Sequence, residues 1–268
     1  MRKPWPDGHP VPAIVDFRDS LARHGVSLIL LIVPGKQTIY PEWLTGRNQP
    51  TPATVRGLPE FLAAMQDSGV NVVDPTDALW AAKSAGDLYL REDTHWTPEG
   101  LDIVADEVAR GLRSNFESTL NLRVEPLTVT RRGDLYDMLQ LPNLPTRFIP
   151  QTVTVNRIVD ADTGAPLEPD PTSSVALLGD SFTNIYSLPD MGWGDHAGLG
   201  EQLALRLSQS VDIIALNDGG VNTARASLAR RRDPFAGKRV VIWQFAARDL
   251  AVSNGNWRFI NIAGPHEE

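Results

Sequence analysis

Five short apolar stretches recur along the chain, each bounded by polar or turn-forming residues. Almost every position in them is apolar, a pattern typical of strands that are covered on both faces of a sheet. The predicted strands are Val26–Val33, Val70–Val73, Val175–Leu178, Val211–Leu216 and Arg239–Phe245.

Between these strands, apolar residues recur at helical spacing. Ile14, Phe17 and Leu21 share one face of a predicted helix that Gly25 is placed to end, and Thr97 is a good N-cap for a helix that starts at Pro98. Regular alternation of strand and helix predicts a three-layer α/β fold around a mostly parallel sheet of about five strands. The predicted helices are 13–24, 58–67, 76–85, 98–112, 199–208 and 222–231.

The alternation stops between Asn115 and Pro171, where Thr, Val and Arg alternate and prolines are frequent. Segments 122–130 and 152–159 are predicted to pair as strands, with loops at 133–135 and 141–150. We therefore predict one domain over residues 1–268 with a β-rich insertion at about 115–171; two independent domains are the alternative. The first twelve residues, rich in Pro and Gly, are predicted to be irregular.

Composition narrows the classes of function. A formal net charge of -8 and a pI near 5.2 argue against nucleic acid as the main partner. The absence of cysteine excludes disulfides, thiolate metal sites and a cysteine nucleophile. The longest apolar run is too short to span a bilayer, and the amino terminus lacks the apolar core of a signal peptide, although a leader or anchor could have been trimmed.

The stretch SSVALLGDSFT contains the first candidate for chemistry, Ser181. Gly179 permits a tight turn after the predicted strand, so that Asp180 and Ser181 emerge at its carboxyl end. Ligands bind at that edge of open α/β sheets, which makes Ser181 a candidate nucleophile. The simpler alternative is that Gly-Asp-Ser is an ordinary loop sequence.

A serine nucleophile needs a base, and His95 is the best placed of five histidines. His95 lies two residues after Asp93, so in an extended segment both side chains point the same way and Asp93 can orient the imidazole. In the alternative interpretation, Asp93 and Thr94 only cap the following helix. Metal binding is a weaker hypothesis because no second histidine lies at a suitable spacing.

An acyl-transfer site also needs donors for the developing oxyanion. The candidates are the amide of Ser181, the turn from Asn217 to Gly220, and Arg248; ordinary turn chemistry and a local ion pair are the alternatives. The loop after the first strand carries Tyr40, Trp43 and Arg47, whose aromatic rings either stack on sugars or pack beneath the loop.

Together these motifs resemble the SGNH hydrolase superfamily, and within it the AlgX/AlgJ family of bacterial polysaccharide O-acetyltransferases. The resemblance rests on LLGDSFT (177–183) and DTHWT (93–97), and on their order, because ordinary SGNH esterases carry the serine first. LNDGGVN (216–222) resembles the glycine block of the superfamily. WQFAARDL (243–250) lies where esterases carry Gly-x-Asn-Asp, with Arg248 at the asparagine position. VPGKQTIYPE and GDLYDML extend the resemblance over most of residues 26–250.

The resemblance implies an SGNH-hydrolase-like, flavodoxin-like fold in which Ser181 is the nucleophile, His95 the base and Asp93 its orienter. It places an oxyanion amide at Gly220 and leaves the role of Arg248 open. It implies no metal and no cofactor. Its partners would be a polysaccharide acceptor, an acetyl donor and a polysaccharide export or acetylation complex, in the periplasm.

The expected reaction is transfer of an acetyl group through an acyl-enzyme to hydroxyls of an exopolysaccharide such as alginate. For a uronate acceptor, Arg131, Arg132, Arg225 and Arg248 are candidates to bind carboxylates. An acetylesterase is the alternative enzyme, because water can replace the sugar hydroxyl. A non-catalytic polysaccharide-binding or assembly protein is the third class.

Overall fold

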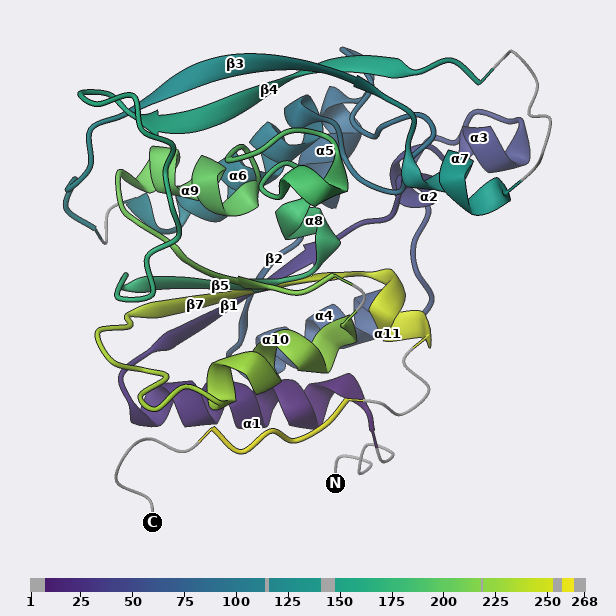
Figure 1. The fold of residues 1–268 in the computed structure, drawn as a ribbon. Helices are drawn as coiled ribbons and strands as arrows, with labels where there is room; N and C mark the ends of the chain where they lie inside the picture. Colours follow the sequence, from purple (N-terminus) through teal and green to yellow (C-terminus); the bar gives the residue numbers. More distant parts are fainter. Residues whose placement is uncertain (1–7, 114–115, 141–147, 218, 253–256, 263–268) are drawn as a thin grey trace.

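The computed structural model describes residues 8–113, 116–140, 148–217, 219–252 and 257–262. Its centre is a five-stranded sheet in the order β2-β1-β7-β5-β6, in which every pairing is parallel (Figure 1). Each strand ends within one residue of its predicted bounds. The strands are β1 (Ser27–Val33), β2 (Asn71–Val73), β5 (Val175–Gly179), β6 (Asp212–Ala215) and β7 (Val240–Ala246).

The two faces of the sheet bury two separate apolar cores. Successive side chains of β1 alternate between them: Ile29 and Leu31 face one core, and Leu28 and Leu30 face the other. Helices α1, α4 and α10 cover one face, and α5, α6, α8 and α9 cover the other (Figure 1). This is the predicted three-layer arrangement, and it explains why the strands read as continuous apolar runs.

Most predicted helices are present with small differences at their ends. Helix α5 ends three residues before its predicted end, and α1 begins three residues early, at Pro10, in the segment predicted to be irregular. Pro10 is the first helical residue, and the Val11 amide donates to His9 Nδ1 at 3.3 Å, so this proline starts the helix. The long helices are α1 (Pro10–Arg23), α4 (Leu58–Asp67), α5 (Thr76–Ala82), α6 (Pro98–Arg110), α9 (Leu199–Leu207) and α10 (Gly220–Ala229).

Several shorter helices lie in segments that the sequence pattern does not predict as helical. α2, α8 and α11 come directly after strands of the central sheet, and α3 and η2 lie further along the connections that begin with α2 and α8. Helix α7 replaces a predicted loop. They are α2 (Lys36–Ile39), α3 (Glu42–Thr45), α7 (Asp134–Leu139), α8 (Ser181–Asn184), the 3₁₀ turn η2 (Pro189–Met191) and α11 (Arg248–Val252).

The predicted insertion is an antiparallel ribbon of β3 (Leu122–Arg131) and β4 (Gln151–Asp160), with α7 between them in the chain. The ribbon lies across the layer of α6 and α9 (Figure 1). Val153 and Val155 of β4 point into the core beneath, whereas Thr128 and Thr154 pair on the outer face. The predicted loop at 141–150 falls largely outside the described residues.

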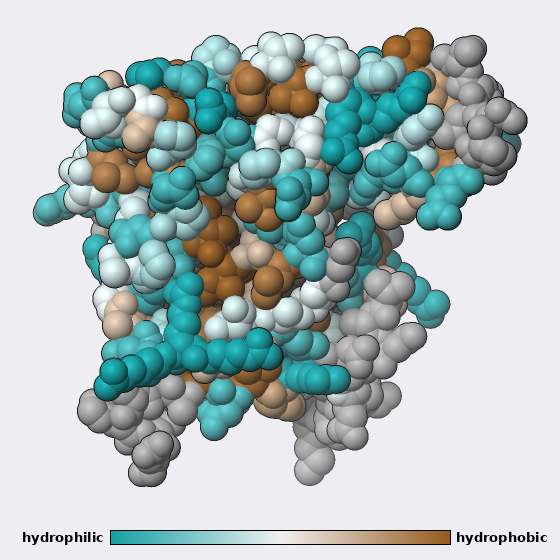
Figure 2. All heavy atoms as spheres, in the orientation of Figure 1, coloured by the Kyte–Doolittle hydropathy of each residue, from teal (hydrophilic) through white to brown (hydrophobic). Residues whose placement is uncertain are grey.

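The outer surface carries both hydrophilic and apolar side chains. On the face shown in Figure 2, hydrophilic side chains dominate, and apolar ones also appear near its middle. Within the described residues, no helix combines the length and the hydropathy needed to cross a membrane.

Candidate active site

Residues 88–97 form a tight hairpin-like loop that presents two side chains to one side. The Leu90 amide donates to the carbonyl of His95, and the Thr97 amide donates to that of Leu88, both at 3.0 Å. Thr97 then caps α6 by accepting from the Gly100 amide at 3.2 Å, as predicted. Hydrogen bonds of its own backbone therefore hold this loop closed.

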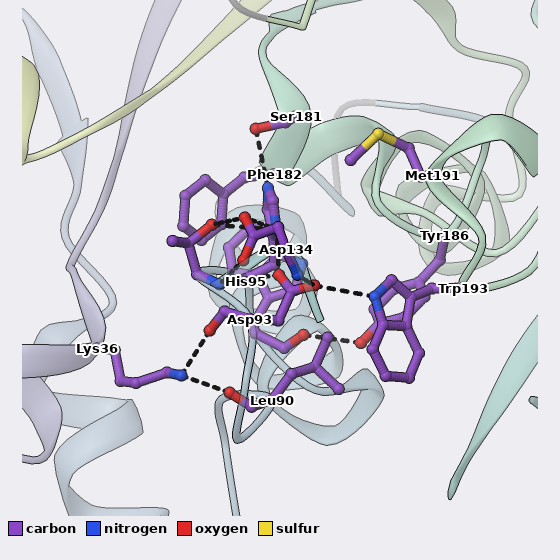
Figure 3. Close-up of polar contacts among 12 residues, drawn as sticks. Lys36, Leu90, Asp93, His95, Asp134, Ser181, Phe182, Tyr186, Met191 and Trp193 are labelled. Atoms are coloured by element: carbon purple, nitrogen blue, oxygen red, sulfur yellow. Dashed lines mark hydrogen bonds and ion pairs between the residues drawn. The ribbon is translucent and has the colours of Figure 1, made fainter. Parts of the chain in front are cut away.

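Within this loop His95 connects Asp93 to Ser181 (Figure 3). His95 Nδ1 lies 2.6 Å from Asp93 Oδ1, and Nε2 lies 2.8 Å from Ser181 Oγ. Because Asp93 is ionised and accepts the Nδ1 proton, Nε2 is left to accept the proton of the serine hydroxyl. The interpretation in which Asp93 and Thr94 only cap a helix is wrong, since Thr97 is the cap and Asp93 holds the imidazole.

Ser181 begins the short helix α8 directly after β5. The turn needs glycine at position 179, where a Cβ would lie 2.1 Å from Thr183 Oγ1. The Asp180 side chain accepts from the Phe182 amide at 2.8 Å, and Gln244 Oε1 accepts from the Asp180 amide at 3.0 Å. The serine is thus held by its own helix cap and by the neighbouring strand β7.

Both oxygens of the buried Asp93 carboxylate accept hydrogen bonds. Oδ1 receives the amide and Nδ1 of His95 at 3.0 and 2.6 Å, and Oδ2 receives the Asp134 amide and Trp193 Nε1, both at 3.0 Å. Burial alone would raise the pKa of Asp93, but the hydrogen bonds and charge of His95, together with the Asp134 amide, lower this pKa to about 2. The carboxylate is therefore ionised throughout the physiological range.

Lys36 fixes the backbone of the same loop. Its Nζ donates to the carbonyls of Leu90 and Asp93 at 2.5 Å each and to that of Arg91 at 3.1 Å (Figure 3). Burial lowers the pKa of Lys36, while the charge of Asp93 opposes this effect. Sequence reasoning assigned no chemistry to Lys36; a lysine directly after the Pro-Gly turn of β1 was the available signal.

Asp134, at the start of α7, is a second acidic residue that sequence reasoning missed. Its carboxylate accepts from the Thr94 amide at 2.8 Å and from the Thr94 hydroxyl at 2.6 Å, and Oδ2 lies 3.8 Å from His95 Nδ1. Asp93, His95 and Asp134 form the one compact group of three His, Asp or Glu side chains among the described residues. Every nitrogen and oxygen atom of these side chains has a hydrogen-bond partner, which accounts for the cluster without an ion.

The predicted oxyanion residues lie at the same edge of the sheet. Arg248 follows β7, is exposed, and places its guanidinium carbon 5.9 Å from the ring centroid of Phe182. Gly220 begins α10, after β6, with a φ of +60°, which favours glycine. Within the described parts of the chain, neither residue makes a hydrogen bond to Ser181 or His95.

Arg225 was wrongly included among the candidates for carboxylate binding. It is buried in the core on the face of the sheet covered by α1 and α10, with its guanidinium carbon 4.4 Å from the ring centroid of Trp243. Burial lowers the pKa of Arg225 to about 10. It packs against aromatic rings and is not accessible to a polymer.

An open pocket of about 250 Å³ lies next to the part of the chain that carries His95 and Ser181. Its lining includes Thr94 and Phe182, the chain neighbours of His95 and Ser181. The loop aromatics have two different roles: Tyr40 is buried and accepts from the Leu88 amide at 2.9 Å, whereas Trp43 stacks on Tyr40 and is 49% exposed. The pocket is also lined by Leu44, Leu135 and Arg248.

The fold has counterparts among known structures. The O-acetyltransferase domain of Pseudomonas putida AlgJ superposes with a TM-score of 0.70 at 26% identity, covering 90% of this chain and 82% of that one. Pseudomonas aeruginosa AlgX shows the same fold, with a TM-score of 0.65 at 19% identity over 88% of this chain and 56% of that one. These similarities define an SGNH-hydrolase-like domain.

The chain belongs to the family described as "SGNH hydrolase-like domain, acetyltransferase AlgX", whose model matches residues 7–247. It is 31% identical over 252 residues to the probable alginate O-acetylase AlgJ of Pseudomonas putida, covering 88% of this chain and 62% of the relative. The corresponding protein of Pseudomonas aeruginosa is 27% identical, with 94% and 67% covered. The chain thus spans about two thirds of the length of these relatives.

Proposed function

We propose that this chain is a polysaccharide O-acetyltransferase that carries the acetyl group on Ser181. The proposal rests on two successive hydrogen bonds, from Asp93 to His95 and from His95 to Ser181, in a domain of an acetyltransferase family. The relatives named alginate O-acetylase favour alginate or a similar exopolysaccharide as acceptor. A periplasmic location is part of the same proposal. Association with an export or acetylation complex belongs to the same proposal.

In the first half-reaction, Ser181 Oγ attacks the acetyl carbonyl while His95 Nε2 takes the hydroxyl proton. The bond to the donor's leaving group breaks, and that group leaves with the proton from His95. In the second half, Nε2 takes the proton of a sugar hydroxyl, whose oxygen attacks the acyl-enzyme. The ester to Ser181 breaks, and the serine oxygen recovers the proton.

Donors for the negative charge on the acetyl oxygen would be the amide of Ser181, the amide of Gly220 and the Arg248 guanidinium. Arg248 also lines the pocket, where it would meet an acceptor carboxylate, and Trp43 offers a half-exposed aromatic face for a sugar ring. Arg131 and Arg132, at the end of β3, remain candidates for contacts further along a polymer.

The test is turnover of p-nitrophenyl acetate with and without an oligosaccharide acceptor. Ser181→Ala should lower turnover at least about a thousandfold, and wild type should show a covalent acetyl group on Ser181 by mass spectrometry. Ser227→Ala, a helical serine in α10, is the matched control and should keep wild-type turnover. Unchanged turnover in Ser181→Ala would contradict the proposal.

Acetylated oligosaccharide among the products distinguishes transfer from hydrolysis. Release of p-nitrophenol without acetylated sugar, for uronate and neutral oligosaccharides alike, would instead identify an esterase. Binding of oligosaccharide with no turnover of any ester would favour a non-catalytic protein.

A further inference from the structure

The Asp93 carboxylate is held from outside its own loop as well as from within it. Oδ1 bonds to His95, but both donors to Oδ2, the Trp193 indole and the Asp134 amide, come from other segments (Figure 3). Trp193 is 1% exposed, and its ring carries one N–H that ends on this oxygen. A buried indole N–H directed at a buried carboxylate forms a charge-assisted hydrogen bond.

Asp134 also brings a second negative charge close to the imidazole. Its Oδ2 lies 3.8 Å from His95 Nδ1, and its side chain is 30% exposed. The Thr94 amide and hydroxyl fix this carboxylate beside the ring. A carboxylate at this distance stabilises a protonated imidazole more than a neutral one.

The fold fixes both residues tightly. A Cβ at Gly133 would lie 2.1 Å from the Glu92 carbonyl oxygen, so only glycine lets the start of α7 approach this closely, and the Leu135 amide bonds to the same carbonyl at 3.0 Å. Trp193 lies in a loop joined to the inserted ribbon, because the His196 carbonyl accepts from the Ile158 amide at 2.8 Å. The insertion therefore helps to build the acid-base half of the site.

We infer that Trp193 and Asp134 are positioning residues that tune the acid-base pair in opposite directions. The Trp193 N–H offsets part of the Asp93 charge, so its removal makes that charge act more strongly on the imidazole. Removing the Asp134 charge does the reverse. The inference rests on the proposed function, since it concerns the pH response of the same serine-histidine pair.

Other charged or titratable groups near the pair come from each packed element and are unchanged by these substitutions. They are Lys36 of α2, Asp180 before α8, Tyr186 after α8, and Arg248 of α11. Because these groups are the same in wild type and in both variants, opposite shifts of the two variants are assigned to Trp193 and Asp134.

The experiment compares the pH dependence of kcat/KM for p-nitrophenyl acetate in Trp193→Phe and Asp134→Asn. We expect the midpoint of the acid limb to rise by roughly 0.5–1 pH unit in Trp193→Phe and to fall by a similar amount in Asp134→Asn. Asparagine keeps the backbone donor to Asp93 and removes the charge, while it exchanges one of the two oxygens that accept from Thr94 for an amide donor. Midpoints that stay at the wild-type value, or that move in the same direction, would overturn the inference.

Trp96→Phe is the matched control for loss of a buried indole. Trp96 is fully buried, and its Nε1 has no hydrogen-bond partner among the described residues, so this variant should lose packing without moving the midpoint. A shift in Trp96→Phe equal to that in Trp193→Phe would overturn the specific role of the Trp193 hydrogen bond.

The inference can be tested separately from turnover. The His95 ring can be titrated by NMR in the folded protein, through its 15N resonances and the low-field proton shared with Asp93. If wild type lacks esterase and transferase activity, the proposed function fails, yet opposite shifts in this titration would still support the positioning roles. Equal titration in wild type and both variants would overturn them whether or not the enzyme turns over.

Discussion

Asp93 and Asp212 are both almost fully buried, at 2% and 1% exposure, but their partners are of opposite kinds. Asp212, at the start of β6, lies between Arg231 and Lys238, with Lys238 Nζ 2.9 Å from Oδ2. Asp93 instead receives N–H donors from two backbone amides, an indole and one imidazole. Asp212 is held by the charged side chains of a lysine and an arginine. Asp93 is held in part by a histidine, a residue that can gain or lose a proton.

On the proposed function, this difference separates a structural use of a buried charge, at Asp212, from a catalytic use, at Asp93. An ion pair with a lysine and an arginine contains no group suited to proton transfer near neutral pH, so it serves to stabilise or orient. A carboxylate kept ionised by neutral donors can respond electrostatically when its histidine takes up a proton. The two ends of the same sheet therefore carry the two roles.

The largest expected effect is the loss of turnover in Asp93→Asn. Loss of the carboxylate leaves His95 in the wrong tautomer, and turnover should fall by about 10⁴-fold. The measurement is kcat/KM for p-nitrophenyl acetate, with circular dichroism to verify folding. A folded variant that keeps more than a tenth of wild-type turnover would contradict the assigned role.

Asp212→Asn should show the converse pattern. It leaves the buried Lys238 ammonium without its carboxylate, and the free energy of unfolding should fall by about 3–5 kcal/mol, because an unpaired buried charge remains. Urea denaturation measures this change, and kcat/KM per folded molecule should stay near wild type. Arg231→Gln is the milder control, because Lys238 still pairs with the aspartate in that variant.

The smallest expected effect concerns acid stability. Because the pKa of Asp93 is lowered to about 2 from 3.8, its ionised form stabilises the fold, by about 2 kcal/mol, above the unfolded value. This contribution is lost as the pH falls toward 2. The difference in unfolding free energy between wild type and Asp93→Asn should therefore shrink between about pH 5 and pH 2; a difference that grows on acidification would contradict it.

The fold was largely predictable because its strands are buried on both faces and read as apolar runs. The serine and the Asp-x-His pair were found because each is local in sequence. Lys36, Asp134 and Trp193 were not, since their roles depend on contacts across 57, 41 and 100 residues that no short-range pattern records. The short helix α7 was missed for a related reason: its start is docked against the Glu92 carbonyl, a tertiary contact that overrides a loop-like sequence.

Between the end of β4 at Asp160 and the start of β5 at Val175 the chain runs through turns and irregular structure. A chain break introduced there would leave Asp93, His95, Asp134 and the whole ribbon on one piece, and Ser181 and Trp193 on the other. Neither piece would contain all three of the residues proposed for catalysis. On the proposed function, ester turnover would report directly on reassembly of the two pieces, which makes this connection the natural place to split the chain into a two-component sensor.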